Sequence, residues 1–178
     1  MRLRPPTSRP GFTLLEMLTT VAVLIIVLGL MVSLARYVRN ELAVEATRDL
    51  LYRLDSLMQQ YETRHAQLPD IVPFVPTDSP TSPLPSEETL QQNAIVNNRS
   101  FVQALRRDNL LTDEFGGLPQ SLFNDLMIRD AWGSPIVFMP SSHAGIGMAL
   151  LDKPFFFSAG PDLKYSTQEN NLYSYEKK

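Results

Sequence analysis

One segment of the chain is long and apolar enough to lie in a membrane, and a single carboxylate stands at its start. From Met17 to Ala35 only two threonines and a serine are polar, and no residue is charged. A helix of about 20 such residues spans a hydrocarbon core of ~30 Å. Glu16 directly precedes this run, and a charge inside a membrane helix costs about 2.5–3.5 kcal/mol to insert. The sequence therefore predicts a membrane helix whose carboxylate has a specific role.

Charge and composition narrow the class of protein. Residues 1–11 contain three arginines and no acid, so a chain without them would change in formal charge from −3 to −6. This acidic balance gives no support for nucleic-acid binding through a basic face. The chain has no cysteine, which excludes a disulfide framework. His65 and His143 are the only histidines, and we expect both to be solvent-exposed. No catalytic constellation stands out, so the sequence predicts a protein that is not an enzyme.

Helical periodicity continues beyond the apolar run. Apolar residues recur at steps of three and four and form one stripe: Leu42, Ala46, Leu50, Leu54, Leu57, Met58 and Tyr61. The pattern predicts a single helix over about 12–65, which ends before Pro69 because a residue that precedes proline disfavours the helical region. Its second half is expected to pack this stripe on a soluble domain.

The rest of the chain reads as a loop followed by a small α+β unit. Residues 69–85 contain six prolines among 17 residues, which is typical of an extended loop. Ser86 followed by two glutamates is a helix-start signal. A second helix is expected near 100–109, a short helix over 122–128, and two strands at 136–139 and 154–159, which would form an antiparallel sheet on the helix stripe. The expected divisions are 1–11, 12–35, 36–67, 68–99 and 100–178.

The N-terminal segment resembles a known processing signal. A glycine, a phenylalanine and a glutamate stand in register directly before the spanning run, in Gly11-Phe12-Thr13-Leu14-Leu15-Glu16. This segment resembles the cleavage and methylation signal of type IV pilins and type II secretion pseudopilins. The resemblance implies that a prepilin peptidase cuts between Gly11 and Phe12, that the new amine of Phe12 is methylated, and that Glu16 is needed for assembly.

The physical chemistry of these three residues agrees with that reading. Gly11 has no side chain, so an extended substrate can enter a narrow protease cleft. Glu16 lies in the first turns of the helix, where a negative charge is favoured by the macrodipole. In a filament, the amine of a neighbouring Phe12 would offset the cost of burying the Glu16 carboxylate. Such a pair would also set the axial register of an entering subunit.

A second resemblance lies far from the first. The matching residues are Asp130, Trp132, Gly133, Pro135, Ser158, Gly160, Pro161 and Asp162. In this order they are similar to the C-terminal half of the major pseudopilin of type II secretion. In that family the loop after the second motif binds calcium, so the resemblance implies a calcium site at Asp162. Downstream, the chain offers further oxygen donors at Glu169 and Asn170, as well as at Ser166 and Asn171. Trp132 is expected to act as a packing anchor, and the tyrosines at 165, 173 and 175 to cover the sheet or contact a neighbour.

Together the two resemblances imply a pilin-like α+β fold and a structural role. The chain would be a pseudopilin held in the bacterial inner membrane by one helix, with its C-terminal domain outside the cytoplasm. Its partners would be the prepilin peptidase, other pseudopilins, and an inner-membrane platform driven by a secretion ATPase. Two alternatives stay open: a minor pilin of a type IV pilus or DNA-uptake filament, and an uncleaved membrane-anchored binding or sensor domain.

Overall fold

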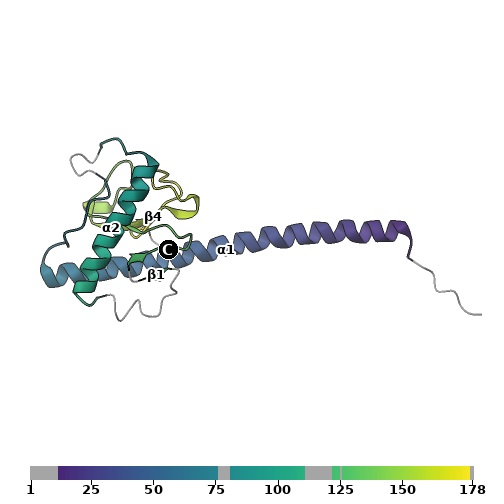
Figure 1. The fold of residues 1–178 in the computed structure, drawn as a ribbon, viewed down its shortest axis with the longest axis horizontal. Coiled ribbons are helices and arrows are strands. Elements are labelled where there is room, and N and C mark those ends of the chain that lie inside the picture. The colour runs from purple at the N-terminus through teal and green to yellow at the C-terminus, as the bar shows by residue number, and fades with distance from the viewer. Residues whose placement is uncertain (1–11, 76–80, 111–121, 125, 177–178) are drawn as a thin grey trace, which may run out of the picture. The chain divides into compact units, whose positions relative to one another are not determined.

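The predicted α+β layout is confirmed by the computed structural model, which describes residues 12–75, 81–110, 122–124 and 126–176 (Figure 1). The chain divides into two compact units, Met1–Arg39 and Asn40–Lys178. Gly11 lies outside the described residues. The elements in chain order are α1 (Leu14–His65), α2 (Glu87–Arg107), β1 (Phe123–Asn124), β2 (Met127–Ile128), β3 (Val137–Met139), the short 3-10 helix η1 (Leu150–Asp152), β4 (Phe155–Ser158), the 3-10 helix η2 (Gly160–Asp162) and β5 (Leu172–Tyr173).

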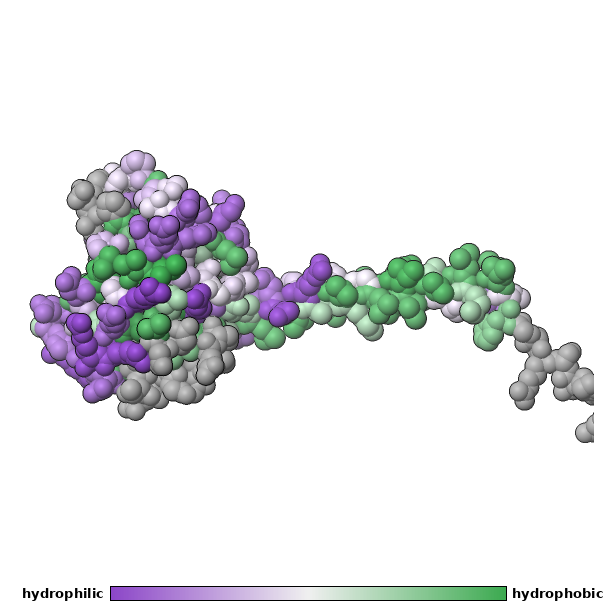
Figure 2. All heavy atoms as spheres, viewed as in Figure 1, coloured by the Kyte–Doolittle hydropathy of each residue, from purple (hydrophilic) through white to green (hydrophobic). Residues whose placement is uncertain are grey.

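Helix α1 runs unbroken for 52 residues, as its sequence pattern predicts. Every side chain from Phe12 to Leu42 is exposed. Among the described residues, α1 is the one helix that is long and apolar enough to cross a membrane, judged by length and composition. Figure 2 shows the apolar side chains that coat its N-terminal half. In water this surface would be highly unfavourable, so it needs lipid or protein around it.

The second unit builds its core on the later part of α1. Five α1 residues are buried against α2 and the sheet: Leu50, Leu51, Leu54, Leu57 and Met58. Phe101 of α2 meets Phe156 of β4 edge-on, with ring centroids 5.2 Å apart. The predicted stripe therefore does pack on the soluble domain. Its first two members, Leu42 and Ala46, are exposed. The first buried residue of α1 is Thr47.

A three-stranded antiparallel sheet forms the other side of this core, in the order β3-β4-β5. Val137 pairs with Phe157, and Phe157 with Tyr173. The face of the sheet opposite α1 carries a second cluster of buried aromatic side chains: Phe74, Phe155, Phe157, Tyr165 and Tyr173. The prediction that the C-terminal tyrosines cover the sheet is confirmed for Tyr165, which packs against Phe157, whereas Tyr173 is itself part of β5.

Two expected elements differ from the sequence prediction. The helix start predicted at Ser86 is confirmed, because Ser86 caps α2 by accepting a hydrogen bond from the Thr89 backbone N–H. The helix expected near 100–109 is the later part of this same helix, which runs from Glu87 to Arg107. The short helix expected over 122–128 is wrong, because β1 and β2 form an antiparallel pair there. The Ile128 backbone N–H donates to the side chain of Asn98, a lateral partner that a helical turn would not need.

Two neighbouring asparagines join α2 to the strands. Asn97 donates to the carbonyls of Val72 and Phe138 and accepts from the Phe138 N–H at 2.8 Å. Asn98 donates to the carbonyls of Ile128 and Ile136 and accepts from the Ile128 N–H at 3.0 Å. Both side chains are fully buried. They bond with backbone groups along the open edge of β3 and at β2. These side chains of α2 therefore supply hydrogen bonds that a neighbouring strand would otherwise supply.

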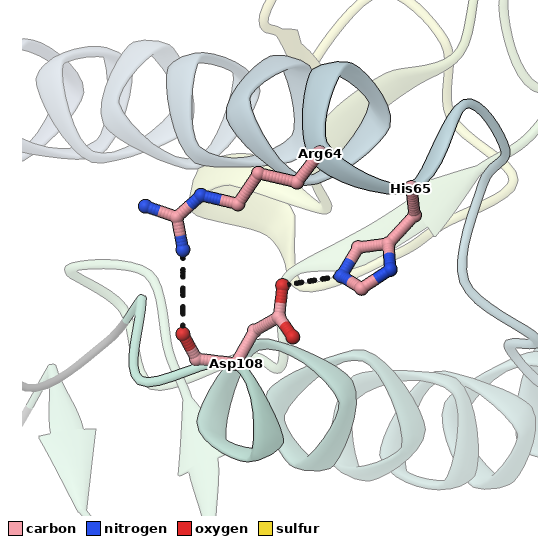
Figure 3. A network of polar contacts seen from close by, with 3 residues as sticks. All are labelled: Arg64, His65 and Asp108. Atoms are coloured by element: carbon pink, nitrogen blue, oxygen red, sulfur yellow. Dashed lines mark hydrogen bonds and ion pairs between the residues drawn. The ribbon is translucent and has the colours of Figure 1, made fainter.

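The ends of the two helices meet at a polar contact (Figure 3). His65 Nε2, at the end of α1, lies 2.6 Å from Asp108 Oδ2, at the C-cap of α2. Arg64 donates to the Asp108 carbonyl at 3.5 Å. His65 is exposed, as the sequence predicts. Partly exposed pairs of this kind contribute ~1 kcal/mol or less, so this contact orients the helix ends more than it stabilises the unit.

Candidate functional site

The carboxylate of Glu16 takes part in capping the N-terminus of α1. The Thr13 backbone N–H and hydroxyl both donate to Glu16 Oε2, at 2.8 and 3.0 Å. In return, the Glu16 N–H donates to Thr13 Oγ1 at 3.2 Å. This reciprocal arrangement is a capping box, which satisfies N–H groups that the first helical turn leaves without partners. It fixes the start of the helix at Leu14, two residues after Phe12.

Two threonines continue the polar side of this site. Thr19 and Thr20 donate their hydroxyls to the Glu16 carbonyl, at 3.0 and 2.9 Å. Because these hydroxyls bond to the helix backbone, they present no unsatisfied donor to an apolar environment. Glu16 carries the only charged side chain between Phe12 and Ala35. Phe12, four residues before it, is 80% exposed.

The structure describes two of the three predicted N-terminal site residues. Glu16 lies in the first turn of α1 and Phe12 lies two residues before the helix begins, while Gly11 lies outside the described residues. Sequence reasoning missed the role of Thr13 as the partner of Glu16. The signal was present, because a threonine three residues before a glutamate and just ahead of an apolar run is the spacing of a capping box.

The two C-terminal motifs meet in space. Ser158 donates to Asp130 Oδ2 at 2.6 Å, and Asp130 Oδ1 accepts from the backbone N–H groups of Trp132 and Ser134. Burial raises the pKa of the Asp130 carboxyl, and these hydrogen bonds oppose that rise. Trp132 packs against the α1 cluster, so the expectation of a packing anchor is confirmed. The resemblance in this region therefore maps onto one connected structural unit.

The loop expected to bind calcium is closed by protein hydrogen bonds. Asp162 Oδ1 accepts from the Lys164 N–H at 3.1 Å, and Asp162 Oδ2 accepts from the Asn170 side chain at 2.9 Å. Slight burial alone would raise the pKa of Asp162, but the hydrogen bonds from Asn170, Lys164 and Thr167 outweigh it and lower the pKa. Glu169 is exposed. The structure brings Asp162 and Asn170 together, with the amide nitrogen of Asn170 facing the carboxylate.

This arrangement does not fit calcium well. Calcium takes six to eight oxygen ligands at about 2.3–2.6 Å. Here both Asp162 oxygens face N–H donors, and no cluster of three or more His, Cys, Asp or Glu residues occurs in the part of the chain that the structure describes. Asn170 takes the place beside Asp162 that a cation would occupy. Calcium binding stays a prediction of the resemblance, and the hydrogen bonds of this loop predict the opposite.

Calcium is accordingly expected to leave the stability of the chain unchanged. A ligand that binds only the folded state at 100 times its Kd stabilises it by about 2.7 kcal/mol. We expect the melting temperature of the full chain in detergent to agree, within about 1 °C, between buffers with 1 mM calcium and with EDTA. A melting temperature that rises by several degrees with calcium, and does not rise in an Asp162→Asn variant, would show that calcium binds at Asp162.

Gly160 is required at its position by both backbone conformation and space. Its φ is +68°, and a Cβ added there would lie 2.0 Å from the Asn170 carbonyl oxygen. We therefore expect Gly160→Ala to destabilise the fold by about 3 kcal/mol, since the 167–171 segment must move and the left-handed conformation is strained for alanine. Thermal unfolding of the full chain would measure this.

Gly133 supplies the matched control for that substitution. Its φ is +95°, but nothing lies within 4 Å of an added Cβ. Gly133→Ala should therefore cost only the conformational part, about 1–2 kcal/mol. If the two substitutions lower the free energy of unfolding equally, the close approach of Gly160 to Asn170 does not contribute to the effect.

The second histidine differs from its predicted environment. His143 is buried, and its Nδ1 accepts from the Gly145 N–H at 3.1 Å within the loop that joins β3 to β4. The expectation that it is exposed is wrong, because the glycine-rich sequence around it folds back over the ring. Its side chain stabilises the turn by this hydrogen bond.

The prediction that the protein is not an enzyme stays a prediction.

Comparison with known proteins gives this chain no relative. No family model, no curated protein and no solved structure matches it.

Proposed function

We propose that the chain is a structural subunit of a type II secretion pseudopilus. In this account a prepilin peptidase cuts between Gly11 and Phe12 and methylates the new amine. The apolar half of α1 then holds the subunit in the bacterial inner membrane, with the unit from Asn40 onward outside the cytoplasm. Assembly by a membrane platform and its ATPase would place the helix in a filament that supports protein secretion.

One observation carries this proposal. Glu16 is an acid at the start of a helix whose first half is apolar and exposed, and its carboxylate is held by Thr13, the residue that follows Phe12. A simple anchor has no use for a charge there, because it adds to the cost of insertion. A subunit whose Phe12 carries a free amine does have a use for it, since the amine of one copy and the carboxylate of the next neutralise each other.

The capping geometry is compatible with such pairing. Both hydrogen bonds from Thr13 go to Glu16 Oε2. A carboxylate has a second oxygen and about four lone-pair sites in all, so it can serve the cap and a neighbouring amine together. We infer that the cap orients the carboxylate before assembly, which limits the loss of side-chain entropy when subunits join.

The connected C-terminal motifs favour a pseudopilus over other filaments. The resemblance there is to the major pseudopilin of type II secretion, and the link between Asp130 and Ser158 places its two halves in one unit. A minor pilin of a type IV pilus or uptake filament is the second candidate. Deleting the gene in its native cells separates them: loss of protein secretion supports the first, and loss of pili or DNA uptake with normal secretion supports the second.

A further inference from the structure

A turn between β3 and β4 presents three large apolar side chains to solvent. Leu150 and Leu151 are 87% and 89% exposed, and Met148 beside them is 66% exposed. We call these three residues the apolar tip. Such a group of large apolar side chains on one turn indicates a contact surface, since single exposed apolar residues are common but clusters are not.

The apolar tip is held in a fixed and unusual conformation. Leu151 and Asp152 both have positive φ, +60° and +53°, although neither is glycine. Ser142 fixes the turn: its N–H donates to Asp152 Oδ1 at 2.6 Å, and its hydroxyl bonds with the backbone of Ala149. A leucine in the left-handed region costs roughly 1–2 kcal/mol, so this strain is maintained by the surrounding bonds. The exposed leucines are therefore displayed by a rigid turn.

A second apolar surface of the same unit lies on α1. Leu42 and Ala46 continue the stripe that is buried from Leu50 onward, yet both are exposed, Leu42 by 61%. Neither this surface nor the apolar tip is covered in the single chain. They therefore do not cover each other within one copy, and each needs a partner from outside.

The charges beside the two surfaces are opposite. Lys153 is exposed and follows the apolar tip after Asp152, whose carboxylate accepts a hydrogen bond from the Ser142 N–H. Its charge partly offsets the burial that raises the pKa of Asp55 in α1 of the same chain. Beside Leu42 and Ala46 on α1, acids recur at every fourth residue, in the row Glu41, Glu45 and Asp49. A surface of leucines edged by a cation thus matches a surface of leucine and alanine edged by carboxylates.

We propose that the apolar tip of one copy docks on the Leu42–Ala46 face of α1 in a second copy. This inference rests on the proposed filament function. Because the two surfaces differ, the contact is heterologous: each copy offers one free tip and one free face to further copies. Contacts of this kind extend into helical filaments rather than closing into dimers. Lys153 meets the acidic row at the rim, and the leucines exclude water at the centre.

Cysteine cross-linking tests the contact directly, because the chain has no cysteine of its own. Cells that lack the native gene would co-express one chain with Leu42→Cys and one with Leu151→Cys. A disulfide needs Cβ atoms within about 3.5–4.5 Å, so only touching surfaces will react. We expect a disulfide-linked heterodimer that disappears on reduction. The matched control pairs Leu42→Cys with Leu163→Cys, a leucine on another turn that is 45% exposed.

Filaments sheared from the same cells are collected as a second readout. Filament yield tests the proposed function, and the cross-link tests the docking contact. Filaments without a Leu42–Leu151 cross-link above the Leu163 control would overturn the docking contact and leave the filament role standing. Absence of both filaments and cross-links would overturn both.

Charge reversal gives an independent readout of the same contact. Lys153→Glu should lower filament yield by roughly fivefold or less, the range of a rim ion pair, and adding Glu41→Lys should restore it. Lys164→Glu, a second exposed lysine, should leave the yield unchanged. No restoration by Glu41→Lys would overturn the pairing of Lys153 with the acidic row.

Discussion

Glu16→Gln is expected to prevent the chain from entering filaments while leaving its helix intact. Glutamine keeps the size of the side chain, and its carbonyl oxygen can still accept from Thr13, so the cap is retained. What it removes is the negative charge that would neutralise a neighbouring Phe12 amine. Leaving one partner of a buried pair alone costs about 3–5 kcal/mol, so we expect filament yield to fall by about 100-fold or more.

Thr13→Ala provides the matched control for Glu16→Gln. It removes the hydroxyl that bonds with Glu16 but leaves the carboxylate in place. Loss of a cap of this type costs about 0.5–2 kcal/mol, so filament yield should fall much less than with Glu16→Gln. Both variants should still be cleaved after Gly11. If Glu16→Gln assembles as well as the unaltered chain, the charge has no role in assembly. That result would favour the alternative of an uncleaved membrane-anchored domain.

Asn98→Ala should have the largest effect on the stability of the soluble unit. Asn98 is fully buried and bonds with backbone groups of Ile128 and Ile136, both also buried. The substitution leaves the Ile128 N–H and the Ile136 carbonyl without this partner, at about 1–3 kcal/mol each. We expect a loss of about 4 kcal/mol, which corresponds to a fall of roughly 10 °C in the melting temperature of the full chain in detergent.

Gln103→Ala is the control for that measurement. Gln103 lies on the exposed face of the same helix, and alanine is at least as good a helix former. Its melting temperature should stay within about 2 °C of the unaltered chain. If Asn98→Ala behaves like Gln103→Ala, the hydrogen bonds from α2 do not hold β2 in place, and the account of how this helix completes the sheet fails.

The elements with a strong local pattern could be predicted from the sequence. The apolar run and the stripe that follows it place α1 almost to the residue, because a helix that faces lipid and then a core carries its periodicity in every turn. The strands β3 and β4 lie where apolar and aromatic runs stand between turn residues. These are features that a short window of sequence contains in full.

Other features depend on partners that lie far away in the chain. The pair Asn97 and Asn98 looks like an ordinary polar surface of a helix, and only the packing of α2 against β2 and β3 turns it into a set of buried bonds. The same dependence explains the error over 122–128, where Asn98 supplies the lateral bond that favours strands. Burial of His143 likewise depends on tertiary packing, because the glycines at 145 and 147 mark the turn but not the environment of the ring.

The candidate site shows both cases side by side. Glu16 stands out in the sequence because a charge beside an apolar run is costly, whereas its bond with Thr13 required only a closer look at spacing. The Asp162 loop shows a feature that its motif does not contain. The motif predicts a cation site, which stays a prediction, whereas the bond from the Asn170 amide to the Asp162 carboxylate becomes evident only in the structure.

Mass spectrometry of the N-terminus of the protein, purified from its native cells, tests the central claim most directly. The account predicts a mature chain that begins at Phe12 with one added methyl group on its amine. A chain that still carries residues 1–11, in cells whose prepilin peptidase is active on other substrates, would contradict it and make an uncleaved membrane-anchored domain the better description.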